Sequence, residues 1–461
     1  MKSFSKLLLL PAIIFSLSAC VATKRDFVQI PGLSQLTTAK VEKISTKQNY
    51  EISQTTYNSY LAFAKKFSKL AISETNKEKE ESLGISIPDA YLCLAITGVV
   101  SNDAARNDVL SYLELQNVEE LRTSVKEILA TFCTLYEDYN HKYHGGYNLN
   151  SIWLNPEDVE LIKEKDEELY KDLEQLFDVS TYMEPLTSQK ANDYLKDNGL
   201  KDMPVPTVKL DDDNPPSMGI MSVYYCLDFF KEETKDYYKQ QYQSGTHKMD
   251  YSVNGVTSKV DYIEQERNGS VYQGNNFYGA DLDIQTLKMS YFLPNNKTSM
   301  PSSILDDVLD NNYQLKQGQY TDWEGSVQQT TTHDVHISAP YFSLDNKVSL
   351  EHNVLEKVLP VITQGGAGRR LVNPLPPNND IYLDFVKQFS VMKFNYDGFY
   401  SCSVTISGSY AESSIPMEYE KFELKLDHPY IFEVQKSVQV GKEYTSLPIV
   451  IGEIVNPDYK D

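Results

Sequence analysis

The sequence changes its character near residue 218, and this change limits the folds that the chain can adopt. Before that point, apolar residues recur at helical spacing or form nearly continuous apolar stretches. The helices predicted from them cover 57–71, 90–100, 104–113 and 118–139. After residue 218 short β-rich runs dominate, and helical patterns are confined to 303–312 and 347–359. Helices followed by strands, without an internal repeat, predict an α+β fold.

Turn-forming residues predict several boundaries. Asn254-Gly255 separates two β-rich runs, which indicates a hairpin. Asn102-Asp103 can cap the helix predicted at 104–113. The Gly-, Tyr- and Asn-rich segment 141–150 predicts a loop, and a strand at 150–155 is expected to lead into a helix opened by Pro156-Glu157-Asp158. The other predicted strands are 248–253, 256–263, 286–293, 333–344, 389–395, 400–407, 422–434 and 446–455.

Composition excludes some classes of protein. The 43 Lys and Arg against 65 Asp and Glu give a net charge of −22, whereas a nucleic-acid binder needs a basic face. Five widely spaced cysteines form neither a disulfide framework nor a zinc pattern. No nucleotide-binding, metalloprotease or nucleophile-elbow motif is present, so the sequence predicts no enzyme activity, no cofactor and no metal site.

The N-terminus has the pattern of an export signal. Lys2 and Lys6 precede the apolar run 7–17, which is too short to span a bilayer. The run ends in Leu17-Ser18-Ala19-Cys20, which resembles the bacterial lipobox, so Cys20 is the predicted lipid attachment site. An ordinary signal peptide with a chance cysteine is the alternative. The predicted location is therefore extracytoplasmic, with the chain lipid-anchored to the bacterial cell envelope or cell surface.

Three longer segments carry a resemblance to a known family. They are Asn150-Ser-Ile-Trp-Leu154, the hairpin sequence 248–263, and the C-terminal pair Asp427-His-Pro-Tyr-Ile-Phe432 and Ile451-Gly-Glu-Ile-Val-Asn-Pro457. Weaker matches are Ser86-Ile87 with Ala90, Asn192-Asp-Tyr194 and 335–342. In this order they resemble the serpins, over about 53–457. The resemblance implies one domain with three β-sheets, eight to nine helices and an exposed reactive-centre loop. The expected organisation is a lipoprotein signal peptide at 1–19, lipidated Cys20 and a flexible tether at 20–52, and a serpin-like domain at 53–461.

The resemblance also implies how such a protein would act. In serpins the exposed loop is attacked by a protease, and the cleaved loop then inserts into the main sheet as a new strand. The hinge of this loop corresponds to Gly398, Phe399 and Ser401. From Phe399 to Ser407 every second residue is small except Phe399 itself, where the family prefers Thr or Ser. The sequence alone leaves open whether burying this ring would cost or gain free energy.

Two further departures from the family lie where the main sheet opens. Cys226 and Gln388 occupy positions at which inhibitory relatives usually have Asn and His, and Ser86 belongs to the same region. The hydrogen bonds that control separation of the strands are therefore expected to differ.

The position of the scissile bond has two readings. Counting forward from Gly398 gives Glu412-Ser413, whereas counting back from Pro429 gives Met417-Glu418 or Glu418-Tyr419. The first implies a protease that accepts acidic side chains, and the second one that accepts apolar or aromatic side chains.

Other candidate sites have weaker support. The segment 364–370 is glycine-rich but lacks phosphate-loop spacing, and it reads as a flexible insertion. The pairs His141/His144 and His333/His336 have no accompanying ligand cluster, and the second pair lies in a predicted strand, where residues three apart face opposite sides.

The sequence thus predicts a monomeric suicide-substrate inhibitor of serine or cysteine endopeptidases, with the target endopeptidase and, through the lipid on Cys20, the membrane as its partners. A non-inhibitory serpin that acts as a surface binding module is the first alternative. An envelope hydrolase with an unrecognised site is the second.

Overall fold

The computed structural model describes residues 35–37, 51–77, 81–133, 135–137, 143–164, 166–199, 204–229, 248–284, 287–322, 324–375, 380–401 and 418–457. The described helices are α1 (Gln54–Thr75), α2 (Ile87–Val100), α3 (Asp103–Tyr112), α4 (Val118–Phe132), α5 (Glu167–Lys171), α6 (Ser188–Asn198), α8 (Leu305–Leu309) and α9 (His352–Leu355), with a π-helical turn at Asp172–Leu176 and a 3₁₀ turn at Pro301–Ser303.

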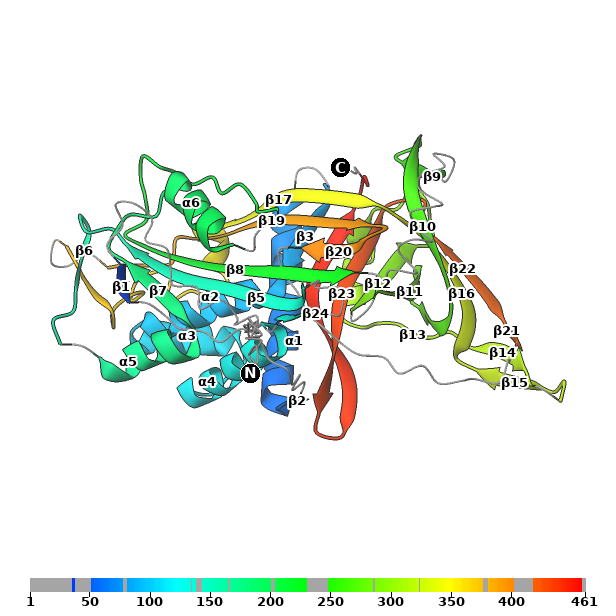
Figure 1. Ribbon diagram of the computed structural model, residues 1–461, viewed down its shortest axis with the longest axis horizontal. Coiled ribbons are helices and arrows are strands. Elements are labelled where there is room, and N and C mark those ends of the chain that lie inside the picture. Colours follow the sequence, from blue (N-terminus) through cyan, green and yellow to red (C-terminus); the bar gives the residue numbers. More distant parts are fainter. Residues whose placement is uncertain are drawn as a thin grey trace, which may run out of the picture.

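The main sheet has the strand order β1-β7-β5-β8-β20-β19-β17, with β4 added beside β5. Its strands are β1 (Gln35–Thr37), β4 (Leu135–Glu137), β5 (Tyr143–Leu154), β7 (Val179–Tyr182), β8 (Met218–Phe229), β17 (Phe342–Glu351), β19 (Phe385–Asn395) and β20 (Gly398–Ser401). Helices α1 to α5 lie on one side of this sheet and α6 lies on the other (Figure 1). Helix α2 packs directly against β8 and is almost entirely buried, which explains its continuous apolar sequence.

A second sheet has the order β22-β16-β10-β11-β12-β23-β24-β3, with β2, β9 and β13 paired at its sides. Its strands are β2 (Glu51–Ile52), β3 (Leu83–Ser86), β9 (Lys248–Val253), β10 (Val256–Gln273), β11 (Phe277–Asp283), β12 (Lys288–Pro294), β13 (Gln314–Leu315), β16 (Thr332–Pro340), β22 (Lys421–Lys425), β23 (Tyr430–Val440) and β24 (Glu443–Ile454). The 18-residue β10 pairs with β9 at its start, with β16 along its middle and with β11 at its end. Two of the three expected sheets are therefore joined through one long strand.

Two small sheets complete the described fold. One contains β14 (Gly318–Thr321), β15 (Val327–Thr330) and β21 (Glu418–Tyr419), and the other contains β6 (Val159–Leu161) and β18 (Val372–Pro374). The first lies at one end of the molecule, beyond β16 and β22 (Figure 1).

Several local predictions are confirmed. The side chain of Asn102 accepts a hydrogen bond from the amide of Ala105 at 2.9 Å and so caps α3. Asn254 and Gly255 have φ angles of 49° and 79°, as the tight hairpin between β9 and β10 requires. The predicted helices at 57–71 and 90–100 lie within α1 and α2. Within the predicted tether, Gln35–Thr37 and Glu51–Ile52 form short strands.

The loop predicted at 141–150 is wrong from Tyr143 onward, because this segment forms the first part of β5. The reason is tertiary. A Cβ atom at Gly146 would lie 1.4 Å from the carbonyl oxygen of Phe132, so only a glycine lets the end of α4 rest on the strand. The helix predicted to continue to residue 139 accordingly ends at Phe132, and Leu135–Glu137 pairs with β5 instead.

Two other predicted helices are wrong, one entirely and one in part. Pro156-Glu157-Asp158 forms a turn that leads into β6, because β6 pairs with β18. The helix predicted at 347–359 is confirmed only at His352–Leu355, which forms α9, because residues 347–351 continue β17, where Val348 and Leu350 face the core. Pairing with β19 outweighs the local helical preference there.

Candidate functional site

The predicted hinge lies inside the main sheet. Strand β20 is placed between β8 and β19, with Gly398 opposite Phe229 on one side and Asn395 on the other. Gly398 has a φ angle of 137°, and a Cβ atom there would lie 2.3 Å from the carbonyl oxygen of Asp228. Glycine is therefore required both by backbone conformation and by the close approach of β8.

Phe399 is fully buried, with 0% of its surface exposed. It lies opposite Asp228 on β8 and Phe394 on β19, both of which are also buried. Tyr400 points to the other face of the sheet and is only half-buried. The ring thus already occupies a site in the core while only four residues of the strand are paired, and the sheet accommodates it.

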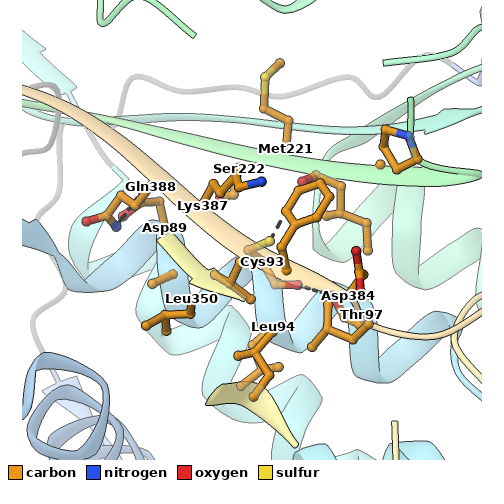
Figure 2. A pocket seen from close by; sticks show the side chains of 18 of the residues that line it. Asp89, Cys93, Leu94, Thr97, Met221, Ser222, Leu350, Asp384, Lys387 and Gln388 are labelled. Carbon is orange, nitrogen blue, oxygen red and sulfur yellow. Dashed lines mark hydrogen bonds between the residues drawn. The ribbon is translucent and has the colours of Figure 1, made fainter. Parts of the chain in front are cut away.

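Beyond β20 the described strands β8 and β19 are not joined by a strand between them. In the described part of the chain no strand pairs with 218–225 of β8 on the side that faces β19, since β20 ends at Ser401. A cavity of about 210 Å³ occupies this position, between β8, β19 and α2. Figure 2 shows it with Asp89 and Gln388 on one side, Asp384 and Thr97 on the other, and Leu94 of α2 below. Most of its lining is apolar, including Phe63, Leu94, Leu350 and Phe389.

Gln388 connects β19 to the start of α2. Its amide oxygen accepts a hydrogen bond from the backbone N–H of Ser86 at 2.9 Å, and its Nε2 donates to the carbonyl of Ser86 at 2.7 Å. The same Nε2 lies 3.3 Å from each carboxylate oxygen of Asp89. Two of the three residues predicted at the sheet opening are thus in direct contact.

Cys226, the third of these residues, lies on β8 directly opposite Ser401 of β20 and Gly146 of β5. Its side chain is fully buried. It therefore marks the point at which β20 stops. The hinge and the sheet-opening residues form one continuous site along the gap between β8 and β19.

Asp89 is the site residue that sequence reasoning missed. It lies in the first turn of α2 and lines the cavity. Burial raises the pKa of Asp89 to about 7, against the opposing effect of hydrogen bonds from Ser86, from the backbone at the start of the helix and from Gln388. The available sequence signal was an acidic residue after Pro88, which by itself indicates only a helix start.

The residues that follow the predicted reactive loop are paired in a small sheet. Tyr419 and Glu418 pair with Tyr320 and Thr321 of β14, and the rings of Tyr320 and Tyr419 are 5.6 Å apart. Of the predicted reactive-site residues, only Glu418 is described. Glu412, Ser413 and Met417 lie outside the described residues, as does the lipid attachment site Cys20.

The weaker candidates are not supported by their surroundings. The segment 364–370 was read as flexible, but it is packed: Asn102 donates to the carbonyl of Gly366 at 3.0 Å, and Arg370 binds the carboxylate of Asp166. The Arg370 guanidinium is therefore already paired with a carboxylate of this chain. His333 is buried and His336 is partly exposed beside Glu266, as expected for opposite faces of β16. The described residues contain no cluster that could hold a metal ion.

Comparison with known proteins supports the fold. No protein-family model and no curated protein matches the sequence. Among solved structures, Serpin48 of the insect Tenebrio molitor has a TM-score of 0.60 and 14% identity, and the match covers 88% of this chain and 99% of that one. Tengpin, a thermophilic serpin in its native state, has a TM-score of 0.60 and 16% identity over 92% of this chain and 99% of its own. Thyroxine-binding globulin in complex with thyroxine has a TM-score of 0.57 and 12% identity over 87% of this chain and 100% of its own.

These matches span nearly the whole length of each serpin and most of this chain. They agree with the α+β architecture of helices and mixed sheets described above. The chain therefore has the serpin fold.

Proposed function

We propose that the protein is a suicide-substrate inhibitor of serine or cysteine endopeptidases. The observation that carries this proposal is the position of β20, which is paired between β8 and β19 with a cavity ahead of it in the same gap. Because β20 already holds β8 and β19 apart at the predicted hinge, further residues of the loop could pair with these strands without a new separation of β8 from β19 at that end.

The chemistry would be supplied by the protease. Its nucleophile attacks the scissile carbonyl and forms an acyl-enzyme, and the peptide leaves with a new amino terminus. The inhibitor's part is mechanical. The freed strand extends β20 along β8 and β19 and draws the attached protease with it, so that hydrolysis of the ester fails.

The register of β20 favours one scissile bond. Continuing the observed pairing would place Thr405 between Ser222 and Gln388, and Ser409 opposite Met218, the first residue of β8. That extension is about 26 Å at about 3.3 Å per residue. Glu412-Ser413 lies just past the end of this ladder, so insertion would pull directly on an acylated Glu412. A bond at Glu418-Tyr419 is disfavoured, because both residues are paired with β14.

The test is incubation of the full chain with proteases that cleave after acidic, apolar and aromatic residues. We expect an SDS-stable adduct with a protease that cleaves after Glu, and a released C-terminal fragment that begins at Ser413. Cleavage without an adduct by every protease would refute inhibition.

A pair of loop variants tests the insertion itself. Thr405→Arg would place a charge on the face that enters the cavity, whereas Ile406→Arg would place it on the opposite face, beside the partly exposed Met221 and Lys387. We expect Thr405→Arg to be cut without forming an adduct, and Ile406→Arg to form one. Equal adduct yields would show that the strand does not enter in this register.

A binding module without inhibitory activity is the second candidate. The bonds of Gln388 to both backbone groups of Ser86 favour it, since they hold β19 against β3 and α2. Nicking of the loop would then leave the melting temperature unchanged. Thyroxine-binding globulin, whose structure was solved with thyroxine, is a fold relative that binds a small molecule.

The proposal includes export and a lipid on Cys20, on the basis of the N-terminal sequence. No helix of the described residues is long and apolar enough to cross a membrane. Mass spectrometry of the N-terminal peptide from a bacterial membrane fraction tests this. A peptide that begins at Cys20 with a diacylglyceryl mass supports the anchor, and an unmodified Cys20 refutes it.

A further inference from the structure

Asp89 is placed where an entering strand would cover it. It lines the cavity from the first turn of α2 and remains partly exposed. The register of β20 would carry an extended strand between Ser222 and Gln388, and the Gln388 amide already contacts the Asp89 carboxylate. Insertion would therefore remove the remaining exposure of this carboxylate.

The groups that face Asp89 are mostly neutral. From β19 and β3 they are Gln388 and Ser86. From β8, Ser222 and Tyr224 line the same cavity, and their hydroxyls donate to the Asn150 side chain and to the Phe132 carbonyl. From α2, Cys93 has a pKa raised to about 12, chiefly by burial, and from α1 the pKa of Tyr60 is raised well above its usual range for the same reason. Both side chains are therefore uncharged near neutral pH.

Two other charged residues lie among the described lining residues, and each has a partner elsewhere. Lys387 Nζ lies 3.5 Å from Glu351 and 4.1 Å above the ring of Phe385. Asp384 lies 3.7 Å from His352 Nδ1, on the side of the cavity away from Asp89 (Figure 2). Within the described part of the chain no cation forms an ion pair with Asp89, so only hydrogen bonds from Ser86, from the start of α2 and from Gln388 offset the loss of its hydration.

We propose that Asp89 is a positioning residue that couples loop insertion to protonation, so that the strand inserts fully only as the Asp89 carboxylate takes up one proton from solvent. This inference rests on the proposed function. No covalent bond forms or breaks in the step, and the proton stays on the buried carboxyl group.

The direction of the pH dependence follows from the pKa of Asp89 before and after insertion of the loop. Before insertion the pKa of Asp89 is about 7 because of burial, and covering the carboxylate raises it further. The inserted state thus holds more protons than the native state between these two pKa values. Insertion is then most favourable below about pH 7, and its equilibrium constant falls by up to tenfold for each pH unit above that, until the pKa of the inserted state is passed.

The experiment measures the rise in melting temperature after the loop is nicked. The full chain is nicked at one pH, freed of protease and transferred to buffers from about pH 5.5 to 9, beside intact protein. Three proteins are compared: wild type, Asp89→Asn and Glu433→Gln. Glu433 is the matched control, because burial raises its pKa to about 7 as well but it lies on β23 and not among the cavity-lining residues.

We expect the rise in melting temperature on nicking to become smaller above pH 7 in wild type and in Glu433→Gln. In Asp89→Asn the same rise should be independent of pH. A second readout is proton uptake on nicking in weakly buffered solution near pH 7.5, where wild type should take up a larger fraction of a proton than Asp89→Asn. If Asp89→Asn does not fold, the wild-type profile is still decisive. A rise in melting temperature that is equal at all pH values refutes the role of Asp89 and leaves the proposed function standing. No rise at any pH in any of the proteins refutes the proposed function instead.

Discussion

Replacing Phe399 by alanine tests whether the hinge is already inserted before the loop is cut. The ring is fully buried opposite Asp228 and Phe394, so its removal leaves an empty space in a packed core. A buried Phe→Ala change costs about 3–5 kcal/mol. With an unfolding entropy of about 2.1 cal/mol/K per residue, a chain of 461 residues should lose about 3–5 °C in melting temperature.

The informative comparison is between the intact and the nicked protein. Because β20 holds the ring in the sheet before cleavage, and the same pairing continues after insertion, both forms bury it equally. We therefore expect Phe399→Ala to lower both melting temperatures by similar amounts, so that the rise on nicking is preserved. Calorimetry measures this, with guanidinium chloride added where the nicked form melts too high. Tyr400→Ala is the control, since its half-buried ring on the other face should cost less.

Loss of stability in the nicked form alone would refute this reasoning. It would mean that the ring reaches its site only on insertion and that β20 is not seated in the intact protein. An unchanged melting temperature in both forms would show that the ring contributes nothing at this position, which contradicts its burial.

Three further predictions follow from the same site and its surroundings. Gly398→Ala should release β20, because the new Cβ would meet the carbonyl oxygen of Asp228, and limited proteolysis should then cut near the hinge faster than in wild type. Gln388→Leu leaves the buried backbone groups of Ser86 without their partner, so chemical denaturation should show a loss of about 1–3 kcal/mol per group; an unchanged midpoint would contradict the bonding seen. Glu433 has a pKa raised to about 7 by burial, so its carboxylate lowers stability as the pH rises from about 4.5 through 7, and Glu433→Gln should flatten the dependence of melting temperature on pH in that window.

Much of the fold could be predicted from local sequence. The Asn102 cap and the Asn254-Gly255 hairpin depend on one or two residues, and both appear as expected. The errors come from contacts with distant segments. Gly146 lies in a strand because the end of α4 needs the space that a side chain would fill, and nothing near it in sequence reports this. The same holds for the start of 347–359, which pairs with β19.

The site was predictable only in part, for a similar reason. Gly398 stands out because a glycine before an alternating small-residue pattern fits a hinge, and the family resemblance fixed its place. Asp89 carried no such signal, because an acidic residue in the first turn of a helix is common and stabilising at the surface. Its raised pKa arises from α2 lying beneath the gap between β8 and β19, which only the assembled sheet reveals.

Two of the three departures from the family, Phe399 and Gln388, therefore differ in meaning. Phe399 is already buried in the intact protein, so it adds no barrier to insertion and gives no reason to doubt inhibition. The barrier lies further along the gap, where Gln388 holds Ser86 and contacts Asp89. In the proposed mechanism an entering strand would have to pass these groups and cover the carboxylate. The choice between the two proposed functions would then depend on the free energy of opening this contact, and not on the unusual residue at the predicted hinge.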